Sequence, residues 1–248
     1  MIDFPARFVL FDQEILWHTV LEALGIFLGM RYYFYLRRKS STRLPFTISL
    51  FIVIGATGGA LIGSKLIGNL EHPEILFNNP FSLKRFWMNN TIIGGLSFGL
   101  IGVELIKKAI GHKESTGDLM VFPLMLAMIV GRVGCFVTGV YEETYGVPTN
   151  SIFGMYLGDE YRRHPVALYE IVFLIVLWIA IAVFKKKHKY ESGRLFQIFM
   201  LCYFGFRFVL DFIKPRYELF WSLGTIQIVC IVVIIYYLYL IFMRDSKK

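Results

Sequence analysis

Cysteine is scarce in this sequence. Its three cysteines, Cys135, Cys202 and Cys230, show no Cys-x-x-Cys spacing, and their number is odd. Both facts argue against a disulfide framework and against a structural zinc site. The sequence also lacks a Gly-x-x-x-x-Gly-Lys-Ser/Thr phosphate loop, and no internal repeat stands out. We therefore expect no metal, no cofactor and no nucleotide-binding loop.

Acidic residues are outnumbered, with 18 Asp and Glu against 26 Lys and Arg, for a net charge of +8. The basic residues collect in short runs between apolar segments and do not form a basic face interleaved with exposed aromatics, which argues against a nucleic-acid partner. A signal peptide is also missing, because residues 1–18 have acidic side chains where a positive region is needed and no small-residue cleavage site. We expect the first apolar segment to be retained.

Apolar residues, in contrast, are abundant. They make up 56% of the 248 residues, and 17% are aromatic, which exceeds the roughly 45–50% apolar content of soluble domains. Windows of about 20 apolar residues, the length that crosses a bilayer, fall at 15–36, 46–68, 91–110, 119–137, 165–184, 194–213 and 221–243. The sequence therefore predicts an all-α polytopic membrane protein with seven transmembrane helices, forming a single integral membrane domain over residues 1–248.

The basic residues predict the orientation of these helices. Connections after the first, third, fifth and seventh windows carry fifteen Lys and Arg, and those on the opposite side carry seven. Positive charge favours the cytoplasmic side. We expect the N-terminus outside, the C-terminus in the cytoplasm, and external loops at about 69–90 and 138–164.

Four basic residues fall within the predicted spans: Arg31, Lys65, Arg132 and Arg207. Arg31 and Lys65 lie near span ends, where long side chains can snorkel to the interface. Arg132 has no acidic residue within one helical turn and stands in a glycine-rich stretch. Such a stretch at membrane depth is tolerated where it is buried in protein or lines a cavity, so Arg132 is a candidate functional residue.

The segment "CYFGFRFVLDF" places Tyr203, Arg207 and Asp211 near one face of the sixth span, at spacings of four residues. One interpretation is a local Arg207–Asp211 ion pair that neutralises itself. The other is an arginine held by Asp211 and presented to an anionic ligand, since a guanidinium suits phosphate and keeps its charge.

Two histidines are candidate general bases, because histidine titrates near neutrality. His164 precedes the fifth span in "RHPVALYE", with Tyr169 and Glu170 one turn inside, and His18 lies at the outer start of the first span beside Trp17. A hydrogen-bonded structural role for His164, and an aromatic-belt position for His18, are the alternatives.

Four motifs occur in a recognisable order: "TIIGGLSFGLIGVE", "GRVGCFVTGVYEETYGVPT", "RHPVALYE" and "GRLFQIFMLCYFGFRFVLDFIKP". Together they resemble the prolipoprotein diacylglyceryl transferase family of bacterial inner-membrane enzymes. The resemblance implies transfer of a diacylglyceryl group from phosphatidylglycerol to the lipobox cysteine thiol of a preprolipoprotein, with release of glycerol phosphate. It implies membrane lipids and a signal-peptide region as partners, no nucleic acid, and a multi-pass place in the bacterial plasma membrane.

The resemblance also implies a site. Arg132 and Arg207 would hold the phosphate of the lipid, and His18 and His164 complete the candidate catalytic residues. The candidate substrate-binding residues are Gly94, Gly95, Gly134, Cys135, Glu143, Tyr169, Tyr203 and Asp211.

The chain departs from the family pattern at several positions. Cys135 stands where the signature reads asparagine, His18 matches a usual tyrosine, and Ile93 stands where many members have a histidine before the Gly-Gly pair. Glu143 matches the signature's acidic residue across an insertion. The alternative functions are a non-catalytic lipid- or lipoprotein-binding protein with the same fold and a small transporter, although no inverted repeat is visible.

Overall fold

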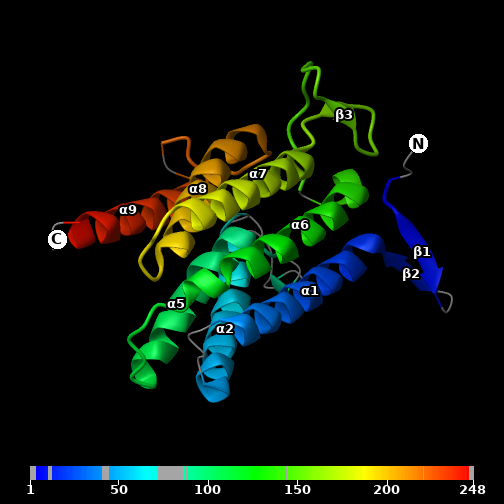
Figure 1. Ribbon diagram of the computed structural model, residues 1–248. Helices are drawn as coiled ribbons and strands as arrows, with labels where there is room; N and C mark the ends of the chain where they lie inside the picture. Colours follow the sequence, from blue (N-terminus) through cyan, green and yellow to red (C-terminus); the bar gives the residue numbers. More distant parts are fainter. Residues whose placement is uncertain are drawn as a thin grey trace. The chain divides into compact units, whose positions relative to one another are not determined.

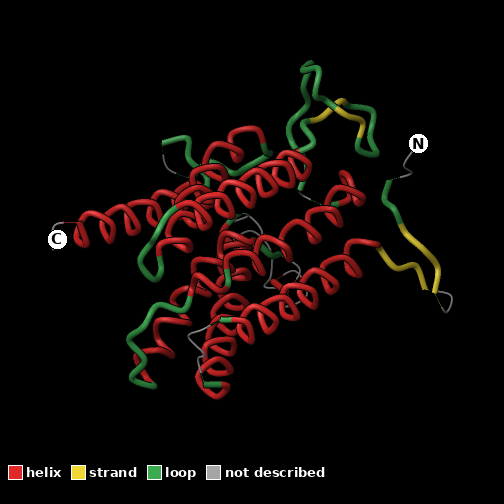
Figure 2. The backbone as a smooth tube through the Cα atoms, in the orientation of Figure 1, coloured by secondary structure: helices red, strands yellow, loops and turns green. Residues whose placement is uncertain are grey.

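The computed structural model describes residues 4–10, 13–40, 45–71, 86–87, 89–142, 144–219 and 221–245. Over these residues the chain is mainly helical (Figures 1 and 2). A helix lies in each of the seven predicted windows, so the all-α fold is confirmed. The helices are α1 (Trp17–Lys39), α2 (Phe46–Leu70), α5 (Ile92–Ala109), α6 (Val121–Thr138), α7 (Val166–Lys187), α8 (Arg194–Leu210) and α9 (Thr225–Asp245).

Short strands and turns connect the helices. β1 (Arg7–Leu10) pairs antiparallel with β2 (Gln13–Leu16), and β3 (Met155–Tyr156) pairs antiparallel with β4 (Arg162–Arg163). Single 3₁₀ turns cover Gly117–Leu119, Gly139–Tyr141 and Asp211–Ile213.

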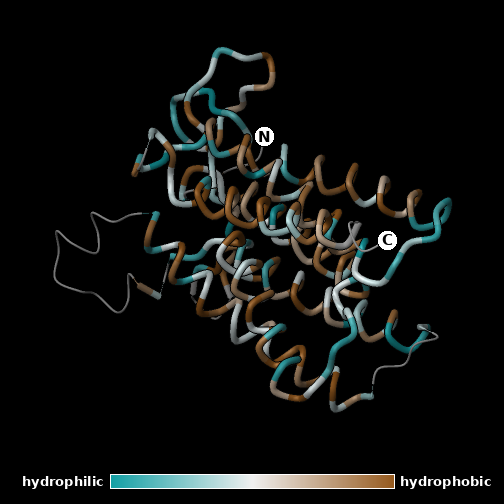
Figure 3. Tube along the Cα trace, turned by 90° about the vertical axis from the view of Figure 1, so that its left-hand side faces the viewer, coloured by the Kyte–Doolittle hydropathy of each residue, from teal (hydrophilic) through white to brown (hydrophobic). Residues whose placement is uncertain are grey.

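Five helical segments among the described residues are long and apolar enough to cross a membrane, which makes the chain a multi-pass membrane protein. They are Phe46–Leu70, Val121–Tyr141, Val166–Lys187, Arg194–Ile213 and Thr225–Met243. Figure 3 shows hydrophobic colouring along the helices and hydrophilic colouring in the connections. α1 and α5 carry more charged residues, so seven spans and their orientation stay predictions. Most of the predicted external loop 69–90 lies outside the described residues.

The chain divides into two compact units, which are described separately. The first comprises residues 1–41, 116–199 and 212–215, and the second comprises residues 42–115, 200–211 and 216–248. The single integral membrane domain over the whole chain stays a prediction.

In the first unit, α1 and α6 lie side by side and antiparallel (Figure 1). Small residues permit this close contact: a Cβ atom at Gly29 would lie 2.9 Å from the Pro123 carbonyl oxygen at the start of α6. At the other end of the pair, a Cβ atom at Gly134 would lie 3.1 Å from the His18 Cα atom. The closely packed pair therefore brings the first turn of α1 against the last turn of α6.

In the second unit, α2 packs against α5 through facing glycines, where Gly94 meets the backbone of Gly63. The Thr225 hydroxyl at the start of α9 donates a 2.6 Å hydrogen bond to the Leu70 carbonyl at the end of α2. Lys65, which was expected to snorkel, is buried and donates a hydrogen bond to the Trp87 carbonyl. Its ammonium group also lies 5.1 Å from the centre of the Trp87 ring.

Candidate functional site

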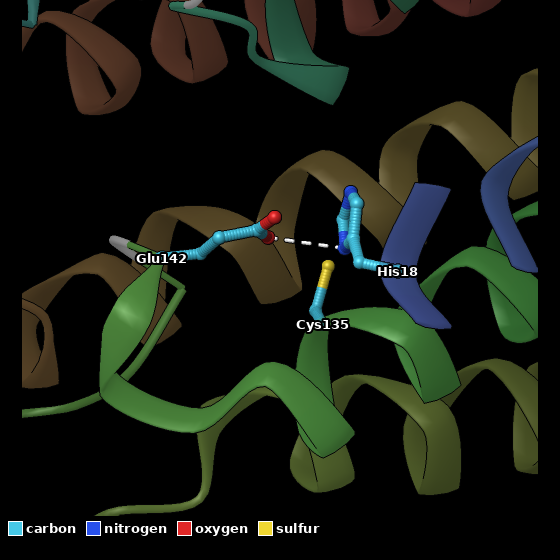
Figure 4. A group of neighbouring side chains, drawn as sticks. All are labelled: His18, Cys135 and Glu142. Carbon is cyan, nitrogen blue, oxygen red and sulfur yellow. Dashed lines mark ion pairs between the residues drawn. The ribbon is translucent and has the colours of Figure 1, made fainter. Parts of the chain in front are cut away.

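A polar cluster lies in the first unit where α1 begins and α6 ends. It consists of His18 from α1, Cys135 from α6 and Glu142 from the turn that follows α6. The three side chains point toward one another (Figure 4). One ligand atom from each lies within 4.8 Å of the other two. We refer to His18, Cys135 and Glu142 as the His-Cys-Glu cluster.

The contacts within the cluster centre on the imidazole of His18. Its Nδ1 atom lies 3.0 Å from Glu142 Oε2, and its Nε2 atom lies 3.6 Å from Oε2 of Glu22, one turn further along α1. The side chains of His18 and Glu142 are only 19% and 28% exposed, and Cys135 is 7% exposed. The imidazole therefore lies between two carboxylates with a buried thiol beside it.

Two glycines explain why this cluster forms. Gly134 lets the backbone of α1 approach α6 at His18, as described above. Gly139 ends α6 with φ +64°, a conformation that favours glycine, and the Val140 amide then donates a 2.9 Å hydrogen bond to the Leu157 carbonyl. The chain leaves the 3₁₀ turn with Glu142 in an extended conformation, at φ −128° and ψ 148°, beside His18.

Arg132 lies one turn before Cys135 on α6 and joins the cluster to α7. Its Nε atom lies 2.8 Å from Glu170 Oε1, and its Nη1 donates a 3.5 Å hydrogen bond to the Cys135 sulfur. The Glu170 side chain is fully buried and that of Arg132 is 9% exposed. A buried carboxylate thus balances the buried guanidinium, and a positive group lies directly against the thiol.

The surroundings of Glu142 disfavour its negative charge. Burial raises the pKa of the Glu142 carboxyl above its usual range, and nearby Glu22 adds to the increase, while His18 and Arg132 oppose it. The carboxylate of Glu142 is therefore stabilised by positive charge placed next to it.

A small hollow borders Cys135 on the side of the loop after α6. Gly139, Thr144, Tyr145 and the first residues of α7, including Val166, complete its lining. Cys135 is thus buried from bulk solvent and borders a small space between the end of α6 and the start of α7.

His164 and Tyr169 form a separate contact in the first unit. His164 Nδ1 lies 3.1 Å from the Tyr169 hydroxyl, and the His164 backbone pairs with Gly146 and Val147. This arrangement fits the structural alternative for His164. Its catalytic role stays a prediction.

The remaining candidates lie in the second unit. Tyr203, Arg207 and Asp211 are almost completely buried along α8 and the 3₁₀ turn that follows it. Gly94 contacts the Gly63 backbone, which explains the glycine by helix packing, whereas a Cβ atom at Gly95 would have its nearest neighbour 3.7 Å away. Arg207 as a second phosphate ligand, and the substrate-binding roles of these residues, stay predictions.

Three of the sequence candidates lie close together in the structure. His18 and Cys135 belong to the His-Cys-Glu cluster, and Arg132 contacts Cys135, while their roles stay predictions. Glu143 lies outside the described residues, and its neighbour Glu142 makes the contact with His18. Glu170 was not assigned a role, although a carboxylate in a predicted span requires a partner, and that signal points to a basic residue such as Arg132.

Comparisons with known proteins identify the family of the chain. A family model described as prolipoprotein diacylglyceryl transferase matches residues 5–243. A phosphatidylglycerol–prolipoprotein diacylglyceryl transferase of Ehrlichia ruminantium is 30% identical over 214 residues, covering 81% of this chain and 79% of the relative. Those of Clostridium tetani and Campylobacter hominis are 28% and 24% identical, covering 86% and 98% of this chain and 86% and 92% of the relatives. With seven helices at the predicted windows and the ordered motifs in place, the chain belongs to the prolipoprotein diacylglyceryl transferase family.

Proposed function

We propose that this protein transfers a diacylglyceryl group from phosphatidylglycerol to the lipobox cysteine thiol of a prolipoprotein in the bacterial plasma membrane. The names of the relatives include both substrates, and the family supports transferase chemistry. The observation that carries the proposal is the position of Arg132, a buried guanidinium in direct contact with the His-Cys-Glu cluster.

The reaction forms one bond and breaks one. The sulfur of the acceptor thiol attacks the glyceryl carbon that bears the phosphate, and a C–S bond forms as the C–O bond to phosphate breaks. The bonding electron pair leaves with the phosphate oxygen, so the products are a thioether, glycerol phosphate and the proton of the thiol. Negative charge grows on the phosphate during this step and requires a fixed positive group.

Arg132 supplies that positive group. Its charge is permanent, and its planar donors match phosphate oxygens. The carboxylate of Glu170 lies 2.8 Å from Nε of Arg132 and provides the counter-charge of the guanidinium within the buried site. Glu170 is therefore a positioning residue for Arg132.

The acceptor thiol must lose its proton, because the thiolate is the nucleophile. The His-Cys-Glu cluster is the group that we assign to this task. The cluster lies beside Arg132, so the activated sulfur and the phosphate of the lipid would bind next to each other.

The test is a transfer assay with purified protein, labelled phosphatidylglycerol and a lipobox peptide. We expect a labelled thioether product with wild type and with Arg31→Ala, which removes an exposed arginine of α1. We expect loss of product with Arg132→Ala, and partial recovery with Arg132→Lys. A folded wild type that binds phosphatidylglycerol but yields no thioether would instead support the non-catalytic alternative.

A further inference from the structure

We propose that the His-Cys-Glu cluster is a zinc site that activates the acceptor thiol. The inference rests on the proposed function for its chemistry, whereas the metal site itself rests on geometry. Imidazole nitrogen, thiolate sulfur and carboxylate oxygen are the three donor types that proteins use for zinc. His18, Cys135 and Glu142 provide one of each.

The spacing of the donor atoms suits one ion. Nitrogen and oxygen ligands bound at about 2.0–2.1 Å to a tetrahedral zinc ion lie roughly 3.3 Å apart. His18 Nδ1 and Glu142 Oε2 are 3.0 Å apart, and the Cys135 sulfur lies within 4.8 Å of both. Small rotations of the side chains would place all three donors at bonding distance of a shared centre.

The surroundings of His18 match those of a metal-bound histidine. A ligating imidazole commonly donates its other ring N–H to a carboxylate, which fixes the tautomer. Glu22 Oε2 lies 3.6 Å from Nε2 of His18, on the side of the ring opposite the atom that faces Glu142. The ring is thus oriented with Nδ1 toward the cluster.

The charges also favour a cation. With zinc bound, Cys135 and Glu142 are both anionic. Arg132, a positive group in contact with Cys135, is balanced by Glu170 at 2.8 Å. Its Nη1 contact with the Cys135 sulfur is 3.5 Å long, so a guanidinium donor can stay on the thiolate while zinc binds another face of the sulfur.

Three protein ligands leave a fourth position of the tetrahedron, as catalytic zinc sites do. A small hollow borders Cys135, and the acceptor thiol would take the fourth position. A thiol that binds zinc is deprotonated outright and releases its proton to solvent. The bound sulfur then attacks the glyceryl carbon, the C–O bond breaks toward phosphate, and the uncharged thioether dissociates because it is a weak ligand.

Metal content tests the site without any activity assay. Protein purified in lipid-containing micelles and dialysed against dilute zinc should retain about one zinc ion per chain. Cobalt in its place should give the near-ultraviolet band of thiolate bound to Co²⁺. Cys135→Ser should abolish this band, and Glu22→Gln should weaken metal binding roughly 10–100-fold. The matched controls Cys202→Ser and His188→Asn, which change exposed side chains, should retain it.

Two results would overturn the site: a folded wild type that retains no zinc, or a cobalt band that survives Cys135→Ser. Since Cys135→Ser alone could disturb folding, Glu142→Gln provides an independent ligand change, with Glu14→Gln on the exposed hairpin as its control. Unchanged metal affinity in Glu142→Gln would also count against the site.

A lipobox peptide separates thiol activation from the metal site. Its cysteine should strengthen the cobalt–thiolate band, and a peptide with serine in that position should not. An unchanged band with the cysteine peptide would refute thiol coordination. Transfer by metal-free protein would refute the zinc proposal and leave the transferase intact, whereas zinc binding without transfer would refute the transferase and leave the metal site intact.

Discussion

The buried ion pair between Arg132 and Glu170 makes the strongest prediction for stability. Glu170→Gln keeps the size of the side chain and an oxygen acceptor but leaves the guanidinium without its counter-charge. Removing one partner of a buried pair typically costs about 3–5 kcal/mol. Glu170 is fully buried and Arg132 is 9% exposed, so this range applies. Because glutamine still accepts a hydrogen bond, we expect the lower end, about 3 kcal/mol.

The measurement is the free energy of unfolding in mixed micelles, followed by tryptophan fluorescence during titration with a denaturing detergent. Glu104→Gln is the matched control, because Glu104 also pairs with a basic residue, Lys107 at 3.0 Å, but is 54% exposed. That control should change the free energy by about 0–1 kcal/mol. A loss in Glu170→Gln no larger than in Glu104→Gln would refute the reasoning.

A double substitution separates stability from function at the same pair. Arg132→Met with Glu170→Met removes both charges, and such replacements are often neutral or stabilising by about 1–4 kcal/mol. We expect the double variant to regain most of the stability lost in Glu170→Gln and to have no transfer activity. Transfer by a stable double variant would show that Arg132 has no role in the chemistry.

The other predictions concern glycines and orientation. Gly134→Ala should push α1 away from α6 at His18, which should lower the free energy of unfolding by about 1–3 kcal/mol and reduce transfer activity. The control is Gly131→Ala, whose added Cβ atom would have no neighbour within 4 Å and which should fold normally. Equal effects of the two substitutions in a thermal unfolding assay would contradict this. Gly94→Ala should destabilise the protein because it contacts Gly63, while Gly95→Ala should fold, so lost transfer in a folded Gly95→Ala would indicate substrate contact. Green fluorescent protein fused after residue 248 should fluoresce and alkaline phosphatase fused there should be inactive, and the opposite pattern would refute a cytoplasmic C-terminus.

The fold was predictable from the sequence because each membrane helix can be recognised from its own stretch of apolar residues. A window of about 20 apolar residues has few alternatives to a helix, and helices occupy all seven windows. Arg132 could be chosen as a candidate functional residue for the same reason, since an isolated charge within an apolar window requires a partner or a function.

The cluster itself was not predictable. Its members come from the start of α1, the end of α6 and the turn beyond it, and the sequence contains no motif with metal-ligand spacing. The expectation of no metal rested only on the number of cysteines and their spacing from one another. A cysteine that pairs with a histidine and a carboxylate from other segments leaves no such pattern.

The contact of Glu142 with His18 depends on the backbone. Glu142 follows the 3₁₀ turn in an extended conformation, and its carboxylate reaches His18. The φ angle of +64° at Gly139 sets the direction of the turn, and sequence alone does not supply that angle.

The order of the units along the chain has a consequence for biogenesis. The first unit is interrupted by residues 42–115, which belong to the second. During synthesis, α1 is therefore made well before its partner α6 exists, whereas α2 and α5 can pair as soon as both are made. The α1–α6 contact closes late and over a long loop, so its formation carries the larger entropy cost. Substitutions at that contact should lower the yield of membrane-inserted protein more than equivalent substitutions between α2 and α5.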